Sequence, residues 1–475
     1  MSVLPRASRA LAVALLASLL AAPSAVARTS TSPSPSPTAS ATPTPGPVIV
    51  NPANPATPGN LTGYGFDQCN APSQSAMDAW MAASPFLAAG IYISGNSRAC
   101  KVQTNLTPTW VANQLARGWH LLPITLGPQA SCSTRFPRYG PKIDPVIDAT
   151  RTSTGAYANA TAQGKLEADR ALAAAAGLGI VPGSTLFYDL EAYDVSKKAC
   201  KESGLAFLSA WTVEIKAHRY LSGVYSSAGS GLKVLDQARA AGAAYAYPDQ
   251  IWIADWNGRA DTGSTYLSPS GWAIHQRVHQ YQGGHNEKWA GVTINIDRNF
   301  LDVGRGSIAS AETHCGGVPV DFASYPKLTP PATGAKVDVT LRPYVKALKC
   351  VMSERGGYTG RINAKLGKGA VAAITAWRGA HGASTTSAVW TKKLWLTLFA
   401  SGARQTIKYG STGPSVRDLQ RALLTTAQTP RPLAITGVLD SSTQAALVAY
   451  QKAHGLSYRG VAGTSTWNAL GSGVR

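Results

Sequence analysis

The sequence is poor in acidic residues and lacks several motifs that identify common enzyme classes. Its 475 residues carry 24 Asp or Glu against 44 Lys or Arg, a formal net charge of +20. No Gly-x-Ser-x-Gly, phosphate loop or dinucleotide fingerprint stands out. This argues against α/β-hydrolases with a nucleophile elbow, P-loop enzymes and Rossmann enzymes. No Cys-x-x-Cys is present, and the six cysteines follow no zinc pattern. We therefore expect no cofactor and no metal.

Long apolar runs are also missing. Arg6 and Arg9 precede an apolar stretch over 10–22, and Ala25-Val26-Ala27 is a small-x-small cleavage site. The stretch is too short to span a bilayer, and no later one reaches the ~18 apolar residues of a membrane helix. We predict a signal peptide over 1–27 and a secreted protein with no membrane association after cleavage.

The six cysteines fit an oxidising compartment. Six cysteines allow many pairings, so spacing alone leaves the connectivity open. Neighbours in sequence are expected to lie on neighbouring loops, and we predict three disulfides on that basis. The predicted pairs are Cys69 with Cys100, Cys132 with Cys200, and Cys315 with Cys350.

Positive charge is concentrated in the last third of the chain. Residues 336–475 contain 19 Lys or Arg against 4 Asp or Glu, a net charge of +15. Such a surface suits nucleic acid, an anionic membrane or an acidic wall polymer. There is no compact Lys/Arg run and no aromatic-basic nucleic-acid motif. We therefore expect a cell-wall polymer as the partner, no nucleic acid, and a monomeric, wall-associated protein.

The composition divides the chain into segments. Residues 28–60 are rich in Ser, Thr and Pro, cannot bury a core and are predicted to be an extended tether. From 61 to 304 short apolar runs alternate with helical segments, the pattern of an α/β protein. Residues 305–337 are predicted to be a linker. Two similar units of about 65 residues, 338–402 and 404–471, then form a repeat.

Eight strands can be placed between residues 61 and 304. They are 63–67, 90–93, 119–124, 186–191, 222–225, 251–255, 278–281 and 293–297. Helical stretches are clearest at 164–176 and 204–218. Eight strand–helix units in roughly 240 residues match a (β/α)8 TIM-like barrel in count and length.

The stretch 185–191 is an apolar, aromatic-rich strand that ends in Asp189-Leu190-Glu191. Side chains two residues apart leave a strand on one face, with Cβ atoms ~6.5–7 Å apart. Two carboxylates this close raise the pKa of at least one, which places a protonated acid beside a carboxylate. Glycosidic-bond cleavage requires that pair. A salt-bridged strand end is the structural alternative.

Other strand ends carry polar or aromatic residues that a barrel would bring to one mouth. The polar ends are Asp67, Glu191, Asp255, Gln280 and Asp297, and the aromatic residues nearby are Tyr92, Tyr225, Trp252, Trp256 and Tyr281. Aromatic faces at such a mouth can stack on sugar rings. We assign Trp252 to packing and leave Trp256 open between packing and stacking. The spacing of His275 and His279 suits zinc only on a helix, whereas their segment reads as a strand.

Five motifs in order carry a family resemblance. They are Gly65-Phe66-Asp67, Tyr188-Asp189-Leu190-Glu191, the run 251–256 (IWIADW), His279-Gln280-Tyr281, and Ile296-Asp297-Arg298-Asn299-Phe300. Together they resemble the family 25 glycoside hydrolases, barrel lysozymes that cleave peptidoglycan. They are closer still to the bacterial glycoside-hydrolase-like family known as domain of unknown function 1906.

The resemblance implies site residues. Asp67, Asp189, Glu191 and Asp297 match the acidic site of the lysozyme family, with Glu191 as the general acid and Asp189 assisting. From their place at or near strand ends, we further expect substrate contacts by Tyr92, Tyr225, Asp255, Trp256, Gln280 and Tyr281. Gln68-Cys69-Asn70 departs from the family pattern, so the substrate loops are expected to be rebuilt.

The repeats carry a second resemblance. The run 410–420 (GSTGPSVRDLQ), with Ile435-Thr436-Gly437-Val438 and the run 463–470 (GTSTWNAL), is similar to the bacterial peptidoglycan-binding domain type 1, a small all-α module. The first unit is more diverged, with Lys349 at the position of the usual Gln. That unit is either a ligand-binding module or a structural spacer, and a protein-binding bundle is the alternative for the second.

These observations favour a secreted cell-wall glycoside hydrolase, muramidase-like, anchored by its C-terminal repeats. The rival hypothesis is a non-catalytic wall protein whose barrel binds glycan without cleaving it. A third is a hydrolase for a different acidic or N-acetylated wall glycan.

Overall fold

The computed structural model describes residues 54–475, apart from 334, 429–431 and 458. The predicted signal peptide and residues 28–53 of the predicted tether lie outside the described residues. The described residues all belong to one unit, Val48–Arg475. None of the helices described is both long and apolar enough to cross a bilayer.

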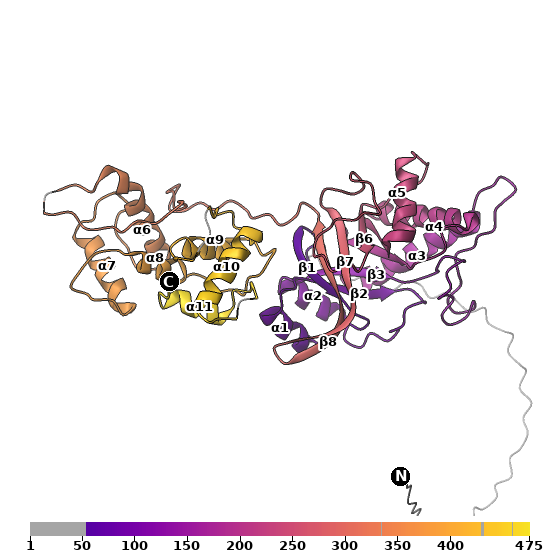
Figure 1. Ribbon diagram of the computed structural model, residues 1–475, viewed down its shortest axis with the longest axis horizontal. Helices are drawn as coiled ribbons and strands as arrows, with labels where there is room; N and C mark the ends of the chain where they lie inside the picture. Colours follow the sequence, from indigo (N-terminus) through magenta and orange to yellow (C-terminus); the bar gives the residue numbers. More distant parts are fainter. Residues whose placement is uncertain (1–53, 334, 429–431, 458) are drawn as a thin grey trace, which may run out of the picture. The chain divides into compact units, whose positions relative to one another are not determined.

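Eight strands close into a barrel in sequence order, as predicted (Figure 1). Each overlaps its predicted range. They are β1 (Leu61–Asp67), β2 (Ala88–Ser94), β3 (His120–Thr125), β4 (Thr185–Leu190), β5 (Leu221–Ser227), β6 (Gln250–Ala254), β7 (Gln276–Trp289) and β8 (Val292–Val303).

The sheet is mixed rather than all-parallel. Strands β1 to β7 pair in parallel, whereas β8 runs antiparallel to both β7 and β1. Ala290 and Gly291, both at positive φ, are the only residues between β7 and β8. Two residues can close a hairpin but cannot make the crossover that a parallel pair requires. The last strand therefore approaches the barrel mouth from the direction opposite to that of the other seven.

Helices cover the barrel where the connections are long enough. They are α1 (Gln74–Ala83), α2 (Pro108–Ala116), α3 (Ala158–Gly177), α4 (Lys198–Ala217), a short π-helical turn η1 (Ala228–Leu232) and α5 (Lys233–Ala240). The two helices expected at 164–176 and 204–218 are confirmed as α3 and α4. The connection from β6 to β7 is built of turns and loops.

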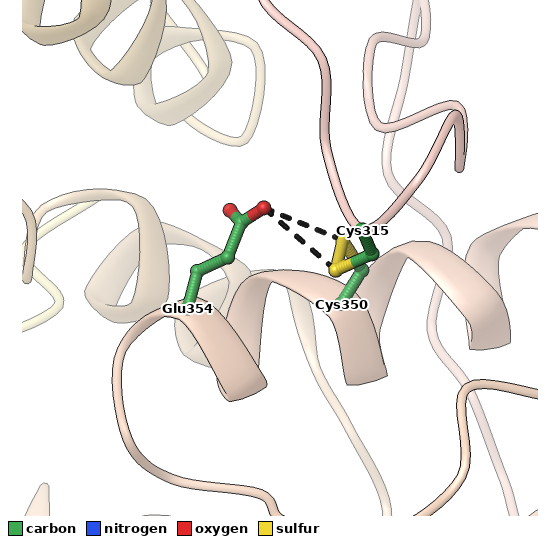
Figure 2. A group of neighbouring side chains, drawn as sticks. All are labelled: Cys315, Cys350 and Glu354. Carbon is green, nitrogen blue, oxygen red and sulfur yellow. Dashed lines mark hydrogen bonds between the residues drawn. A yellow bond between two sulfur atoms is a disulfide. The ribbon is translucent and has the colours of Figure 1, made fainter.

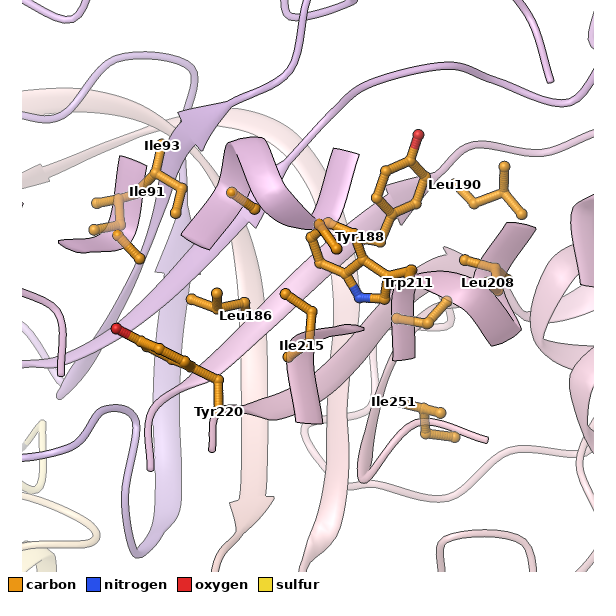
Figure 3. Packing of buried hydrophobic residues seen from close by; sticks show 14 of the residues in the cluster. Ile91, Ile93, Leu186, Tyr188, Leu190, Leu208, Trp211, Ile215, Tyr220 and Ile251 are labelled. Atoms are coloured by element: carbon orange, nitrogen blue, oxygen red, sulfur yellow. The ribbon is translucent and has the colours of Figure 1, made fainter. Parts of the chain in front are cut away.

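Strand β4 separates two apolar layers. Its outward side chains Leu186, Tyr188 and Leu190 are fully buried in the outer core, which also contains Trp211 and Ile215 of α4 (Figure 3). Phe187, on the other face, belongs to the barrel interior together with Trp252. Alternation along β4 therefore directs Asp189 to the same interior face as Phe187.

The C-terminal region is all-helical. It contains a 3-10 turn η2 (Val339–Leu341), α6 (Arg342–Glu354), α7 (Lys368–Ala380), α8 (Lys392–Phe399), α9 (Pro414–Leu423), α10 (Ser441–Ala453) and α11 (Thr464–Gly471). Helices α6–α8 fall in the first predicted unit and α9–α11 in the second. Val320, Tyr325 and Leu328, from the segment predicted as linker, pack into the same apolar core.

The hydrogen bonds of Gln420 in the second unit show what Lys349, at the corresponding position, does in the first unit. The fully buried amide of Gln420 donates to Val438 O at 3.0 Å and Thr443 Oγ1 at 2.9 Å, and its oxygen accepts from Gly437 N–H. Gln420 therefore ties a turn to α9. Lys349 in α6 makes a similar tie, because its Nζ donates to Asn363 Oδ1 at 2.9 Å. Both residues serve the framework of their units.

All three predicted disulfides are confirmed. Cys315–Cys350 joins the segment before α6 to that helix, and Glu354 Oε1 lies 3.7 and 3.6 Å from its two sulfurs (Figure 2). Metal binding requires thiolates, so these oxidised sulfurs are not ligands. Cys69–Cys100 joins the loops after β1 and β2, at the barrel mouth.

Candidate active site

Four carboxylates gather at the end of the barrel interior where the parallel strands finish. Asp67 ends β1, Asp189 is the fifth residue of β4, and Glu191 directly follows that strand. Asp297 lies within β8, where antiparallel register places it opposite Asp67. The β7–β8 hairpin therefore places the carboxylate of Asp297 at this mouth on a strand that runs opposite to the other seven.

Asp67 is held by amide donors inside the barrel. It is 4% exposed; Asn299 Nδ2 donates to its Oδ1 at 2.7 Å, and Gln280 Nε2 donates to Oδ1 and Oδ2 at 3.1 and 3.3 Å. Burial and then the charge of Asp297 raise the pKa of Asp67 to about 8, against the effect of both amides. Burial also raises the pKa of Asp297, to about 6. The raised pKa values indicate that the Asp67–Asp297 pair retains a proton near neutral pH.

Asp189 is a buried carboxyl group with a raised pKa. It is 1% exposed, and Tyr92 donates its hydroxyl to Oδ2 at 3.3 Å. Its Oδ1 has no hydrogen-bond partner among the described residues. Burial and then the neighbouring Glu191 raise the pKa of Asp189 well above its ordinary value. The direction of this shift favours the protonated form of Asp189.

Glu191 is the accessible member of the Asp-x-Glu pair, with a side chain 21% exposed. Its backbone N–H donates to Gln129 Oε1 at 2.8 Å, while Gln129 Nε2 donates to Asp189 O at 2.7 Å. One glutamine thereby fixes the backbone that carries both carboxyl groups. The side chain of Arg135 is exposed, and its Nη1 lies 3.2 Å from Glu191 Oε2.

Two cavities meet at Glu191. The first, of about 220 Å³, we call the arginine cavity; it is lined by Asp67, Gln68, Cys69, Tyr92, Arg98, Ala99, Cys100, Leu126, Arg138, Glu191, Asn295, Ile296 and Asp297. The second, of about 360 Å³, we call the aromatic cavity; it is lined by Arg135, Glu191, Ala192, Tyr225, Ser227, Ala228, Gly229, Ala254, Asp255, Trp256 and Tyr266. Glu191 is the one residue common to both linings.

Trp256 presents an indole to the aromatic cavity in a fixed position. Its side chain is 67% exposed, yet Nε1 donates to Gln280 Oε1 at 2.9 Å. Tyr225 donates its hydroxyl to the same oxygen at 3.0 Å. A Cβ at Gly283 would lie 2.7 Å from the indole, so glycine at that position makes room for the ring. Because Gln280 also donates to Asp67, one amide connects the aromatic cavity to the buried acid.

The predicted substrate contacts divide into three groups. Tyr92 lines the arginine cavity, and Tyr225, Asp255 and Trp256 line the aromatic cavity. Gln280 is buried beneath both and supports Asp67. Tyr281 lines neither cavity; it is buried beside His279.

Two further predictions concern packing and metals. Trp252 packs inside the barrel as predicted, and its Nε1 donates to Asn299 Oδ1 at 2.7 Å. His275 Nδ1 pairs with Asp302 at 2.8 Å, whereas both ring nitrogens of His279 contact backbone carbonyls. The two histidines therefore have separate partners.

Sequence reasoning missed several residues of the site. Asn299 follows Asp297 by two positions, so strand alternation could have placed it on the same face. Gln129, Arg98 and Arg138 lie on loops, and no local pattern in the sequence distinguishes them from ordinary surface residues.

A closed barrel with four carboxylates at one mouth is compatible with a glycoside hydrolase-like domain. More particularly, residues 78–301 match the family model described as an Rv2525c-like, glycoside hydrolase-like domain. Residues 412–470 match a peptidoglycan binding domain and coincide with α9–α11. Both resemblances found in the sequence are thereby confirmed.

Solved structures of similar proteins have low identity to this chain. The Mycobacterium tuberculosis Tat-secreted protein Rv2525c, in complex with L-tartrate, is 16% identical, with a TM-score of 0.33 over 50% of this chain and 95% of that one. An uncharacterized B. stearothermophilus protein is 18% identical, with a TM-score of 0.31 over 50% and 95%. The catalytic domain of endolysin ply40, from bacteriophage P40 of Listeria monocytogenes, is 12% identical, with a TM-score of 0.29 over 51% and 93%. Among curated proteins, none matches the chain significantly.

Proposed function

We propose that this protein is a secreted cell-wall glycoside hydrolase that cleaves peptidoglycan glycan strands. The observation that carries the proposal is the position of Glu191, an accessible carboxyl group shared by two cavities. A glycan that occupies both cavities would place one glycosidic bond beside Glu191. Hydrolysis of that bond needs a proton on the leaving oxygen and stabilisation of an oxocarbenium-like transition state.

The four carboxyl groups take different roles in this reaction, according to how deeply they are buried. Glu191 is the general acid, because it is the carboxyl group of the Asp-x-Glu pair that reaches solvent. Asp189, buried beside Glu191, assists either by stabilising the oxocarbenium-like transition state or by orienting the neighbouring sugar substituent. The Asp67–Asp297 pair holds a proton and a negative charge near the developing cation, and positions water.

The peptidoglycan-binding domain supports the choice of substrate. A module that binds the same polymer raises the local concentration of glycan at the barrel without altering the site. The net charge of +15 over residues 336–475 adds attraction to an acidic wall. Export through the predicted signal peptide would bring the protein to this polymer.

A specific contact favours a second function, that of a non-catalytic glycan-binding wall protein. Arg135 pairs with Glu191, and a carboxylate that remains in an ion pair is unavailable for proton transfer. In this alternative the two cavities recognise glycan and the carboxyl groups only shape the mouth.

Reducing-end release from purified peptidoglycan, measured beside pelleting with the same walls, separates the two functions. A hydrolase releases new reducing ends in proportion to time and enzyme. Pelleting without any release, from peptidoglycan and from other wall glycans, would refute the hydrolase and establish the binding protein.

Trp256→Ala is expected to raise KM for glycan about 3- to 10-fold with a small change in kcat. The exposed indole stacks on a sugar ring in ground state and transition state alike, a contact worth about 1 kcal/mol. Trp256→Phe keeps a ring and should recover most of the loss. The exposed Val102, which lines neither cavity, provides the control Val102→Ala. An unchanged KM in Trp256→Ala would contradict the stacking role.

A further inference from the structure

The arginine cavity contains positive charge that the proposed acid chemistry does not require. Arg98 and Arg138 line it together with Asp67, Glu191 and Asp297. Both arginines are half-buried. Among the described residues neither arginine has a carboxylate within ion-pair distance, whereas Arg135 on the other side of Glu191 has one. Partly buried guanidinium groups that are not in an ion pair can bind an anion through charge-assisted hydrogen bonds.

Backbone carbonyls hold both guanidinium groups in place. Arg98 donates from Nε to Gly95 O at 2.8 Å and from Nη1 to Tyr92 O at 3.1 Å. Arg138 donates from Nη1 to Ser97 O at 3.0 Å. A guanidinium has five N–H donors, so these contacts orient each group and leave donors for a ligand. Carbonyl oxygens carry no net charge, and the carboxylates of the same cavity lie beyond ion-pair distance of both guanidinium groups.

The loops that carry the arginines are locked to one another. The Tyr139 hydroxyl donates to Arg98 O at 3.0 Å, and Lys101 Nζ lies 3.7 Å from the centre of the Tyr139 ring. The Asp144 carboxylate accepts from the backbone N–H groups of Arg138 and Tyr139 at 2.6 and 2.9 Å. The Cys69–Cys100 disulfide closes the same wall. Because the wall is pre-organised, little ordering entropy opposes ligand binding.

An unsatisfied acceptor completes the pattern. Gln68, which lines the cavity, is 6% exposed and donates from Nε2 to Gly90 O, while its Oε1 has no partner among the described residues. The cavity thus combines cationic donors and a neutral acceptor with its carboxylates. An acidic sugar matches the donors and this acceptor, since its carboxylate accepts from arginine and a hydroxyl or amide group donates to Gln68.

We propose that the arginine cavity is a subsite for a carboxylate-bearing sugar, with Arg98 and Arg138 binding the carboxylate and Gln68 accepting from a neighbouring hydroxyl or amide. The identity of the ligand as a glycan rests on the proposed function, whereas the preference for negative charge rests on the cavity itself. The carboxylate belongs either to a lactyl ether, as on a muramic sugar, or to a uronic acid.

Binding of four monosaccharides to the full chain tests this subsite without any turnover. N-Acetylmuramic acid and N-acetylglucosamine form one pair, and glucuronic acid and glucose form the other. We expect at least one acid to bind about 10- to 100-fold more tightly than its neutral partner, the range expected for charge-assisted hydrogen bonds. The pair that shows the larger ratio identifies the source of the carboxylate, and the ratio should fall with added salt.

Arg98→Gln/Arg138→Gln is expected to reduce that ratio to about one while the affinity for the neutral sugar persists. Arg138→Gln alone loses a single backbone contact and should reduce the ratio in part. This single variant keeps the test valid if the double variant misfolds. Arg151→Gln, an arginine that also contacts a backbone carbonyl but lies outside both cavities, is the control.

Equal binding of acidic and neutral sugars by the wild-type chain would overturn the subsite, as would a ratio that survives in both arginine variants. Failure of the proposed function looks different. Acid preference with no release of reducing ends would retain the subsite and refute the hydrolase.

Discussion

Glu191→Gln is expected to lower reducing-end release from peptidoglycan by about 10²- to 10⁴-fold, the usual contribution of a general acid. Glutamine keeps the size of the side chain and the backbone contact to Gln129, but has no proton to give to a leaving oxygen. Binding to cell walls should be unchanged, because the C-terminal module is untouched. Parallel measurements of release and pelleting check both expectations.

A leaving group that needs no protonation provides a sharper test of the role. On an aryl glycoside with a weakly basic phenolate, Glu191→Gln should lose far less activity than on the natural polymer. Glu202→Gln is the matched control, because the Glu202 side chain is 25% exposed against 21% for Glu191 and accepts from Tyr157 on the outside of the barrel. Equal losses on both substrates would contradict the assignment of Glu191 as the acid.

Asp67→Asn is expected to stabilise the fold while it abolishes activity, and the gain should grow with pH. The folded pKa of Asp67 is about 8, so the native state binds more protons than the unfolded state between the ordinary aspartate pKa and about 8. The free energy of unfolding of the wild type therefore falls as pH rises through this window. The free-energy cost of burying an ionised Asp67 is absent at pH values below the ordinary aspartate pKa and complete above about pH 8. Asparagine does not titrate and avoids the penalty.

Denaturant unfolding at pH 4, 6 and 8 measures this effect. The difference between Asp67→Asn and wild type should rise across the series to a few kcal/mol. The amide oxygen of asparagine can still accept from Asn299 and Gln280, and its NH₂ group can donate to Asp297, so the local network survives. Asp169→Asn, at a surface carboxylate 46% exposed, should show no such trend. A pH-independent difference would indicate that Asp67 is ionised throughout.

Much of the fold follows from patterns that are local in sequence. The eight apolar segments predict eight strands because a buried strand has its own length and composition. The i and i+2 spacing of Asp189 and Glu191 predicts one shared face, since alternation is a property of the strand alone. The three disulfides join cysteines that are neighbours in sequence, on loops close to one another in chain order.

Two features of the site depend on contacts that local patterns do not encode. Asp297 pairs with Asp67 across 230 residues because β8 turns back on β7 and closes the barrel in antiparallel register. Arg98 and Arg138 line one cavity because separate loops are tied together by hydrogen bonds and a disulfide. Strand register and loop conformation have no signature in residue spacing. Neither the Asp67–Asp297 pair nor the cavity shared by Arg98 and Arg138 can therefore be predicted from spacing.

The sequence by itself thus determined the strands, the acidic pair and the two C-terminal units, because periodicity and composition act over a few neighbouring residues. The tertiary structure alone decided that the barrel is mixed, that the segment before α6 packs with the helices, and that Glu191 separates an arginine cavity from an aromatic one. These features arise from strand register and from packing between distant segments, which are set only when the whole chain is folded.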